Sequence, residues 1–459
     1  MDAHAAPAGT SRLVPPVPEP PEHDLSMLRF IAAIRTNGTA GWSKRAYEEL
    51  VSRRSLLGRS NLMVSDPDGI RHVLVDNVPN YRRTPASVRV LRPMLGDGLL
   101  ISEGQAWRRQ RRVLAPAFTP RAVEVLVPHI LSATNEAIAR VAAAAEAGPV
   151  DLFDALQHLA LEIAGRTMFS VDMRRHGERL RQMIAAYQTR LGRPHLPDLL
   201  LPLRWPAPHD IPRALFRRRW VRFLDEVIAA REAKGDTATS GDLLDLLVAA
   251  RDSETGEGFT REQLRDQVAT MIMAGHETTA VTLLWAAYLL ALSPEWQDAV
   301  AEEAQEAGAD LEMGWEDRLP LTRAVIDETL RLYPPAHIIV RMAQGPDVVA
   351  GQAIAAGDVV AISPWILHRH RRLWLDPAAF DPRRFLPGAP AIPRMAYLPF
   401  GVGPRICIGA QFALAEATLA LAKLAGAFRM TIEGTRPVLP AAVVTTQPDH
   451  APGFRLSRR

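Results

Sequence analysis

The sequence predicts a mainly α-helical protein with smaller β-sheets, an α+β fold. Helical periodicity dominates from about residue 122 to residue 332. Short β-like runs follow between residues 335 and 363, bounded by turn residues. A helix that is apolar on nearly all sides, as a buried helix should be, then runs from about Gln411 to Leu424.

Composition and charge narrow the class of protein. With 47% hydrophobic and 23% charged residues, the chain has the composition of an ordinary globular protein with a substantial core. A formal net charge of only +3 argues against a nucleic-acid partner. Cys407 is the only cysteine, so no intrachain disulfide can form, and we expect a reducing, cytoplasmic compartment.

The N-terminal residues 1–24 are rich in alanine and proline and contain no apolar window of about 20 residues. We therefore expect a stiff, extended lead-in there and no membrane anchor. The length of 459 residues would by itself suggest about three domains, although length is a soft guide.

The helical part has two interruptions and one long central helix. A proline-rich stretch and a polar loop divide it, and Thr260 with Gln263 forms a capping box that starts a helix reaching about Leu292. At 1.5 Å per residue this helix is roughly 50 Å long. The other expected elements are helices at 174–192 and 213–234, separated by the proline-rich stretch 194–212, the polar loop 252–259, strands at 338–340 and 359–362, and a last pair of short strands before Arg459.

The middle of the long helix is unusual. Residues 274–279 read Ala-Gly-His-Glu-Thr-Thr, and a mid-helix glycine costs about 1 kcal/mol relative to alanine. The residues alone leave two interpretations open. Thr278 and Thr279 are either threonines that hydrogen-bond back to their own helix, with Glu277 a partly exposed carboxylate, or a group that handles oxygen and protons.

The residues around Cys407 point to a metal. A single cysteine is usually an inert, packed side chain. Here glycines flank it, so the backbone can approach a flat object, Phe400 can pack on that object and Arg405 can pair with an anionic group on its rim. The helix that follows presents its positive end to the sulfur and favours a thiolate. This arrangement describes an axial ligand of heme.

Residues 400–409 resemble the heme-binding signature of the cytochrome P-450 superfamily, Phe-Gly-x-Gly-x-Arg-x-Cys-x-Gly, and every fixed position is met. The resemblance implies one large catalytic domain, residues 25–459, with the cytochrome P-450 fold. In that fold heme b (iron protoporphyrin IX) lies between a long distal helix and a proximal cysteine loop and helix. Cys407 would ligate the iron as thiolate, a ligand that favours cleavage of the oxygen–oxygen bond.

The central helix also resembles the family, whose pattern there is Ala/Gly-Gly-x-Asp/Glu-Thr-Thr. By this resemblance Thr278 and Glu277 are catalytic and deliver protons, and Ala274 leaves room for the macrocycle. His276 occupies the variable position, and we do not expect it to be a ligand.

Three further segments resemble family motifs. Glu328 and Arg331, three apart on a helix, would form a structural triad with Arg384, although Arg383 stands where the family usually has glutamate. Trp107 and Arg111, one helical turn apart, resemble a pair that binds a heme propionate. The remaining expected cofactor contacts are Arg341, Arg405, Phe400, Gly401 and Gly409.

The resemblance implies a monooxygenase that inserts one atom of O2 into an apolar organic substrate by hydroxylation or epoxidation. Electrons would come from a ferredoxin or flavodoxin-type donor with its NAD(P)H reductase, because no redox domain follows the cysteine loop. The two helices beside the proline-rich stretch would form a mobile lid; the alternative is a surface loop without a gating role. The expected substrate pocket, with parts of 87–99, comprises Met271, Met273, Ala274, Ala336, His337, Ile338 and Ile339.

Two other functions remain as alternatives. A peroxide-driven peroxygenase would use the same heme without Glu277 and Thr278, and a non-catalytic heme-binding or gas-sensing protein would need neither residue. The sequence does not identify the substrate. It also leaves open whether His337 contacts the substrate or points into the sheet.

Overall fold

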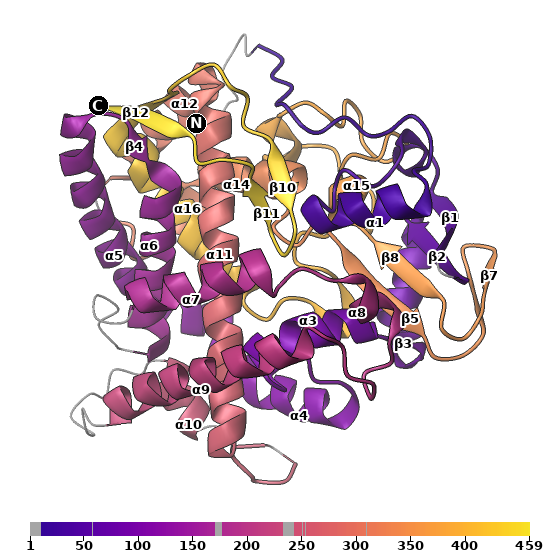
Figure 1. The fold of residues 1–459 in the computed structure, drawn as a ribbon. Helices are drawn as coiled ribbons and strands as arrows, with labels where there is room; N and C mark the ends of the chain where they lie inside the picture. The colour runs from indigo at the N-terminus through magenta and orange to yellow at the C-terminus, as the bar shows by residue number, and fades with distance from the viewer. Residues whose placement is uncertain are drawn as a thin grey trace.

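A long helix, α11 (Arg261–Ala291), crosses the centre of the molecule and organises the helices around it (Figure 1). The computed structural model describes residues 11–56, 58–169, 177–232, 243–249, 251–252, 254–308 and 310–459. Its other helices are α1 (Met27–Thr36), α2 (Pro67–Arg71), α3 (Pro85–Leu95), α4 (Gly104–Leu114), α5 (Pro120–Ala147), α6 (Leu152–Ala164), α7 (Gly177–Arg190), α8 (Leu196–Leu200), α9 (Asp210–Glu232), α10 (Leu243–Ala249), α12 (Pro294–Ala307), α13 (Trp315–Arg318), α14 (Pro320–Leu332), α15 (Pro364–Leu367) and α16 (Ala410–Ala427).

The core lies where α11 packs against α6, α14 and α16, with α5 packed in turn on α6 and α16. Most of α11 is buried on all sides, which explains its nearly continuous apolar sequence. The fully buried Trp285 of α11 stacks on Tyr333 with ring centroids 4.1 Å apart, and its Nε1 donates a hydrogen bond of 2.7 Å to the carbonyl of Thr446. This contact ties the central helix to the C-terminal strands.

A five-stranded sheet lies to one side of the helical core, under α1 in Figure 1. Its strand order is β1-β2-β8-β5-β3, with β2 and β8 parallel and the other neighbours antiparallel. The pairing of β5 with β8 places the chain just before β5 at the boundary between sheet and helices. The strands are β1 (Val51–Leu56), β2 (Arg59–Val64), β3 (Tyr81–Arg82), β5 (Ile339–Ala343) and β8 (Val359–Ile362).

The remaining strands form small sheets. β6 (Asp347–Val349) pairs with β7 (Gln352–Ile354), and β10 (Pro440–Ala442) pairs with β11 (Thr446–Pro448). β12 (Gly453–Arg458) lies between β9 (Phe428–Ile432) and β4 (Val150–Asp151). We expected one last pair of strands, but the C-terminal segment contains two pairs. The difference arises because β12 pairs with β4 and β9, which are distant in the sequence. The two short strands between β9 and β12, namely β10 and β11, pair with each other as a hairpin.

Most expected elements are present at the predicted places. The hydroxyl oxygen of Thr260 accepts a hydrogen bond from the backbone amide of Gln263 (3.2 Å), and the side-chain oxygen of Gln263 accepts one from the backbone amide of Thr260 (3.0 Å), which confirms the capping box. Helices α7 and α9 correspond to the helices expected at 174–192 and 213–234, of which residues 174–176, 233 and 234 lie outside the described residues. The proline-rich stretch between them contains the short helix α8, which we had not expected.

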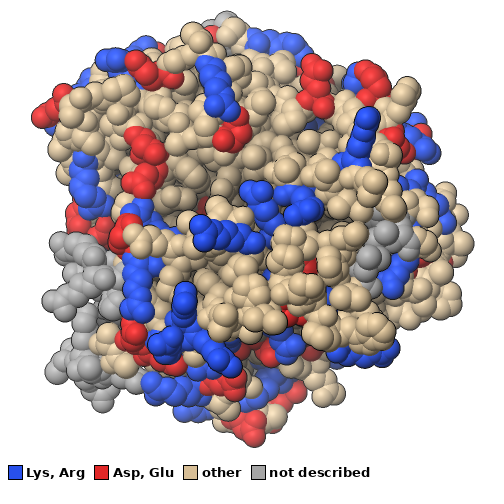
Figure 2. Space-filling view, viewed as in Figure 1, with Lys and Arg blue, Asp and Glu red and all other residues tan. Residues whose placement is uncertain are grey.

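Acidic and basic side chains alternate over the face shown in Figure 2, where they form no large single-sign patch. This distribution agrees with the small net charge of +3. In the part of the chain that the structure describes, each helix is either too short or too polar to cross a lipid bilayer.

Candidate active site

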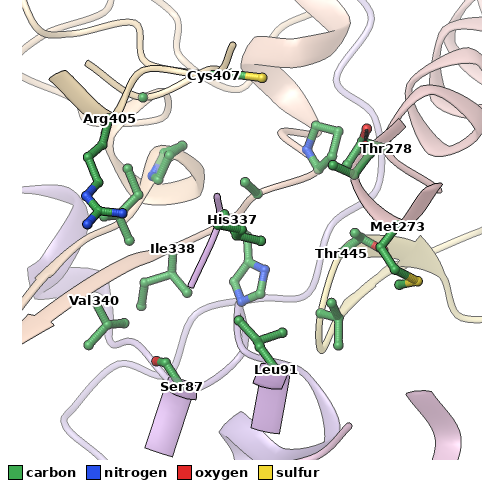
Figure 3. Close-up of a pocket in the computed structure, with 18 of the residues that line it drawn as sticks. Ser87, Leu91, Met273, Thr278, His337, Ile338, Val340, Arg405, Cys407 and Thr445 are labelled. Carbon is green, nitrogen blue, oxygen red and sulfur yellow. Dashed lines mark hydrogen bonds between the residues drawn. The ribbon is translucent and has the colours of Figure 1, made fainter. Parts of the chain in front are cut away.

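A cavity of about 840 Å³ lies between α11, the cysteine loop, α3, α4 and the segment that leads into β5 (Figure 3). Every residue predicted from the sequence to contact cofactor or substrate lines it. These residues are Trp107, Arg111, Met271, Met273, Ala274, Glu277, Thr278, Ala336, His337, Ile338, Ile339, Arg341, Phe400, Gly401, Arg405, Cys407 and Gly409. Side chains from α3 within 87–99 also line the cavity, as predicted.

The loop before α16 presents Cys407 to this cavity. Gly401 and Gly403 adopt φ angles of 72° and 74°, which other residues rarely reach, and a Cβ at Gly403 would collide with the carbonyl of Leu74. The amide of Cys407 donates to the carbonyl of Phe400 at 2.9 Å and closes the loop. Figure 3 shows the sulfur pointing into the space beside the loop, and Cys407 is solvent-accessible although it lies inside the fold.

The start of α16 does lie beside the sulfur, but its effect on the thiol is smaller than we expected. Burial raises the pKa of the Cys407 thiol, while the amide of Gly409 and the charge of Arg111 lower it. Because burial is the largest influence, the protein alone does not favour the thiolate at Cys407. A bound metal cation would, since a coordinating thiol loses its proton.

In the middle of α11, Ala274 is exposed although residues on both sides of it in the helix are buried. Its exposed surface belongs to the cavity. Thr278, one turn later, also lines the cavity, and its hydroxyl donates a hydrogen bond of 2.5 Å to the carbonyl of Ala274. The small residue and the hydroxyl thus share one wall of the cavity, and Thr278 makes the backbone hydrogen bond that the sequence had suggested.

Glu277 is buried, not partly exposed as one interpretation of the sequence supposed. Its carboxylate accepts hydrogen bonds from Gln188 of α7 and from Thr445, and a third, of 2.5 Å, from Gln447. Burial raises its pKa, and these three donors oppose that effect. Sequence reasoning could not identify these three partners, because they lie far from Glu277 along the chain and belong to no motif.

His276 faces away from this site. It is buried, it is not among the residues that line the cavity, and neither of its ring nitrogens has a hydrogen-bond partner among the described residues. Burial lowers its pKa to about 4. Its position agrees with the prediction that it is not a ligand.

Three arginines gather on the side of the cavity next to the cysteine loop. Arg405 donates to the carbonyl of Ser102 (2.8 Å) and to Glu103, and Arg83 lies 3.3 Å from the same carboxylate. Burial, together with the neighbouring arginines, lowers the pKa of Arg341 to about 9 and that of Arg405 to about 10. Sequence reasoning missed Arg83, because it belongs to no recognisable motif.

Trp107 and Arg111 face the cavity from α4, as their spacing predicted. The guanidinium of Arg405 lies 4.6 Å from the centre of the Trp107 ring, and Arg111 donates a hydrogen bond of 2.9 Å to the carbonyl of Ile406. Two other arginines of α4, Arg109 and Arg112, form ion pairs with acids of the 252–257 loop.

The structural triad forms away from the cavity. Arg331 and Glu328 are both fully buried, with Nε of Arg331 2.6 Å from the carboxylate of Glu328. Arg384 completes the group at 3.6 Å from Glu328, and its Nη2 donates to the carbonyl of Asp376 at 2.9 Å. Arg383, the departure from the family motif, pairs instead with Asp381 near the surface.

These residues fit a heme group. The thiol of Cys407 and the exposed Ala274 line the same cavity. A heme requires such a pair, a metal ligand and a small residue that leaves room for the flat ring. Two of the three arginines, Arg83 and Arg405, share the carboxylate of Glu103. Nη1 of Arg405 is buried without a partner among the described residues, so this guanidinium can donate to a carboxylate on the rim of a heme. The sequence had predicted two of these arginines.

Comparison with known proteins agrees with this geometry. A family model described as Cytochrome P450 matches residues 43–450. Cyclooctatin synthase of Streptomyces melanosporofaciens is 34% identical over 420 residues, which cover 89% of this chain and 87% of that protein. Cyclooctat-9-en-7-ol 5-monooxygenase of the same organism is 32% identical over 415 residues (88% and 85%), and pentalenene oxygenase of Streptomyces avermitilis is 34% identical over 377 residues (80% and 81%).

Solved structures show the same fold. The crystal structure of the cytochrome P450DA heme domain has a TM-score of 0.78 and 26% sequence identity, covering 98% of both chains. The crystal structure of a cytochrome P450 named CYP102L1 has a TM-score of 0.81 and 24% identity, and it covers 97% of this chain and all of that one.

Proposed function

This chain belongs to the cytochrome P450 family and is a heme-containing monooxygenase, and from that premise we propose how its residues perform the reaction and on what substrate. The cofactor would be heme b, bound within a single catalytic domain of residues 25–459. The observation that carries the proposal is that Cys407 and the Ala274–Thr278 turn of α11 line one cavity.

Cys407 would hold the iron as thiolate, and the heme would then supply the activation of O2 that insertion of oxygen into an organic substrate requires. Arg341, Arg405 and Trp107 would bind the propionates, together with Arg83. Arg111 would support the cysteine loop through its hydrogen bond to Ile406. Phe400, Gly401 and Gly409 would pack along the plane of the macrocycle from the loop side.

Thr278 and Glu277 would hold and move the protons that reduction of oxygen consumes. The hydroxyl of Thr278 can turn from the carbonyl of Ala274 toward the cavity, and the carboxyl of Glu277 can carry a proton because its buried position raises its pKa. Gln188, Thr445 and Gln447 would position Glu277 for this task. A glutamate held by neutral donors can change its protonation state without breaking an ion pair.

We propose an apolar, cyclic terpenoid as the substrate. The cavity wall is mostly hydrophobic, with Phe30, Leu91, Met94, Met273 and Ile338 among the lining residues. Two of the relatives, cyclooctat-9-en-7-ol 5-monooxygenase and pentalenene oxygenase, carry the names of bacterial terpene oxygenases, and they match most of this chain.

Helices α7 and α9, with α8 between them, would act as a lid over the substrate. Gln188 of α7 lines the cavity. The buried ion pair between Arg213 of α9 and Asp198 of α8 (2.7 Å) would make α8 and α9 move together. Closure would exclude water from the reacting groups.

Electrons would come from a separate ferredoxin or flavodoxin-type protein with its reductase. Among the arginines of α4, Arg109 and Arg112 are already paired with acids. Arg108 is exposed and stays a candidate contact for an acidic donor. A cytoplasmic location stays a prediction from the single cysteine.

Turnover of a cyclic terpenoid under ¹⁸O2 with a ferredoxin, its reductase and NADPH would test the proposal. A monooxygenase should place one ¹⁸O atom in the product, and Thr278→Ala should lower that yield. If the protein oxidises the terpenoid only with added hydrogen peroxide, and Thr278→Ala is then fully active, the peroxygenase alternative is correct. A protein that binds heme but oxidises nothing under either condition would support the non-catalytic alternative.

A further inference from the structure

His337 is a polar side chain in an apolar part of the cavity wall. It lies between α14 and β5, and its carbonyl accepts hydrogen bonds from the hydroxyl of Ser363 (2.7 Å) and the amide of Trp365 (3.4 Å). These bonds fix the backbone, so the side chain projects toward Leu91 and Ser87 of α3 (Figure 3). The structure therefore answers the question that the sequence left open: His337 lines the cavity.

The His337 imidazole has no polar partner in the part of the chain that the structure describes. Only 7% of His337 is exposed, and Nδ1 is buried without a hydrogen-bond partner among the described residues. No described residue bonds Nε2 either. Buried polar groups in proteins are nearly always hydrogen-bonded, so an imidazole without a partner on the wall of a ligand cavity needs an explanation.

The protein makes room for this ring. A Cβ on Gly38, another residue of the cavity wall, would lie 2.6 Å from Nε2 of His337. Glycine at position 38 therefore leaves space for the imidazole, where any side chain would displace it.

The other hydroxyl groups of the wall already have partners. Ser87 shares a hydrogen bond of 2.9 Å with Thr84, Thr270 donates to the carbonyl of Asp266 at 2.8 Å, and Thr445 donates to Glu277. To donate a hydrogen bond to a bound molecule, Thr270 and Thr445 would have to give up these contacts, whereas His337 has no such contact to give up.

The surroundings of His337 are uncharged. Burial alone lowers its pKa to about 4, with no contribution from a neighbouring charge, so the ring is neutral at pH 7. A neutral imidazole carries one donor and one acceptor nitrogen. A hydroxyl group can bond to such a nitrogen, whereas the neutral ring itself offers a carboxylate no ion pair.

We propose that His337 binds a hydroxyl group of an otherwise apolar substrate and so orients that substrate in the cavity. This inference rests on the proposed function and narrows its substrate class to a cyclic terpenoid that already carries an alcohol. The reaction that supplies the substrate must then be one that introduces a hydroxyl group, such as an earlier hydroxylation or a cyclisation ended by water.

Matched ligands of one shape would test the proposal on the heme-loaded protein. Adamantane, 1-adamantanol and 1-adamantanecarboxylate share a rigid apolar cage and differ in one substituent. Their dissociation constants would be measured by optical titration of the heme spin state and by calorimetry. Wild-type protein should bind the alcohol at least as tightly as the hydrocarbon, and more tightly than the carboxylate. The first of these two preferences is the diagnostic one, because an apolar site without a partner would bind the hydrocarbon more tightly than the alcohol.

Substitution of His337 should remove the preference for the alcohol. In His337→Phe the dissociation constant of 1-adamantanol should rise about tenfold, because a buried hydroxyl without a partner costs that much, while that of adamantane changes less than about threefold. His337→Val removes the ring without adding volume and should give the same result if the phenylalanine variant does not fold. His337→Gln, which keeps a donor and an acceptor, should restore part of the preference.

Ile338→Val is the matched control, since it trims the neighbouring side chain of the same wall. It should weaken both ligands alike and leave their ratio unchanged. An alcohol preference that persists in His337→Phe and His337→Val, or a wild-type protein that prefers the carboxylate, would overturn the inference. Failure of the proposed function would be distinct, because the wild-type protein would then lack heme-thiolate absorption or fail to oxidise any terpenoid.

Discussion

The buried pair Arg331 and Glu328 allows a stability prediction worked out from the structure. Arg331 donates two hydrogen bonds to Glu328 (2.6 and 2.7 Å) and three to backbone carbonyls between 2.7 and 2.8 Å, and both side chains are completely buried. Removing one partner of such a pair costs about 3–5 kcal/mol, because the other charge is left buried.

In Arg331→Ala the loss should be near the lower end of that range, about 3 kcal/mol. Glu328 would keep a hydrogen bond from the amide of Asp381 (2.8 Å) and the more distant charge of Arg384 at 3.6 Å. A typical protein has only about 5–15 kcal/mol of stability, so the variant should also lose heme during purification.

Equilibrium unfolding in urea, followed by tryptophan fluorescence, would measure this loss. Arg383→Ala is the matched control, since its arginine lies next to the triad but its side chain is 54% exposed and pairs with Asp381. That variant should lose less than about 1 kcal/mol, as exposed ion pairs do. If the two variants differ by less than 1 kcal/mol, the buried pair does not have the structural role assigned to it.

Three further predictions concern the site and its surroundings. Burial raises the pKa of Glu416 in α16 from 4.5 to about 8. The folded protein therefore keeps this proton while the unfolded chain loses it, so the free energy of unfolding falls as pH rises between these two values. Urea unfolding should show that the free energy of unfolding of the wild-type protein falls by roughly 3 kcal/mol more between pH 5 and pH 8 than that of Glu416→Gln. Thr278→Ala should lower the O2-dependent rate of product formation about 100-fold, while Thr278→Ser keeps most of it; equal rates in all three proteins would exclude the proton role. Arg341→Gln should speed heme transfer to apomyoglobin at least tenfold, because a charged hydrogen bond is worth about 1.5–3 kcal/mol, and an unchanged rate would remove Arg341 from the propionate site.

The parts of the site that could be predicted are those whose residues are consecutive or lie one helical turn apart. The cysteine loop, the middle of α11 and the Trp107–Arg111 pair each carry their chemistry within a few residues, so their spacing alone places the side chains together. The same holds for the capping box at Thr260, which set the start of α11 correctly.

The parts that could not be predicted depend on tertiary contacts. Gln188 belongs to α7, whereas Thr445 and Gln447 belong to the β10–β11 hairpin, and only the tertiary fold brings these two distant segments to Glu277. The pKa of Cys407 is another example, because the degree of burial outweighs the helix start that the sequence reveals.

Absorption of the reduced protein under carbon monoxide tests the central claim most directly. If Cys407 ligates the iron as thiolate, the wild-type protein should show the red-shifted Soret band of thiolate ligation, and Cys407→Ala should lack it. A wild-type spectrum without that band, or a Cys407→Ala protein that keeps it, would contradict the assignment of Cys407 as the iron ligand.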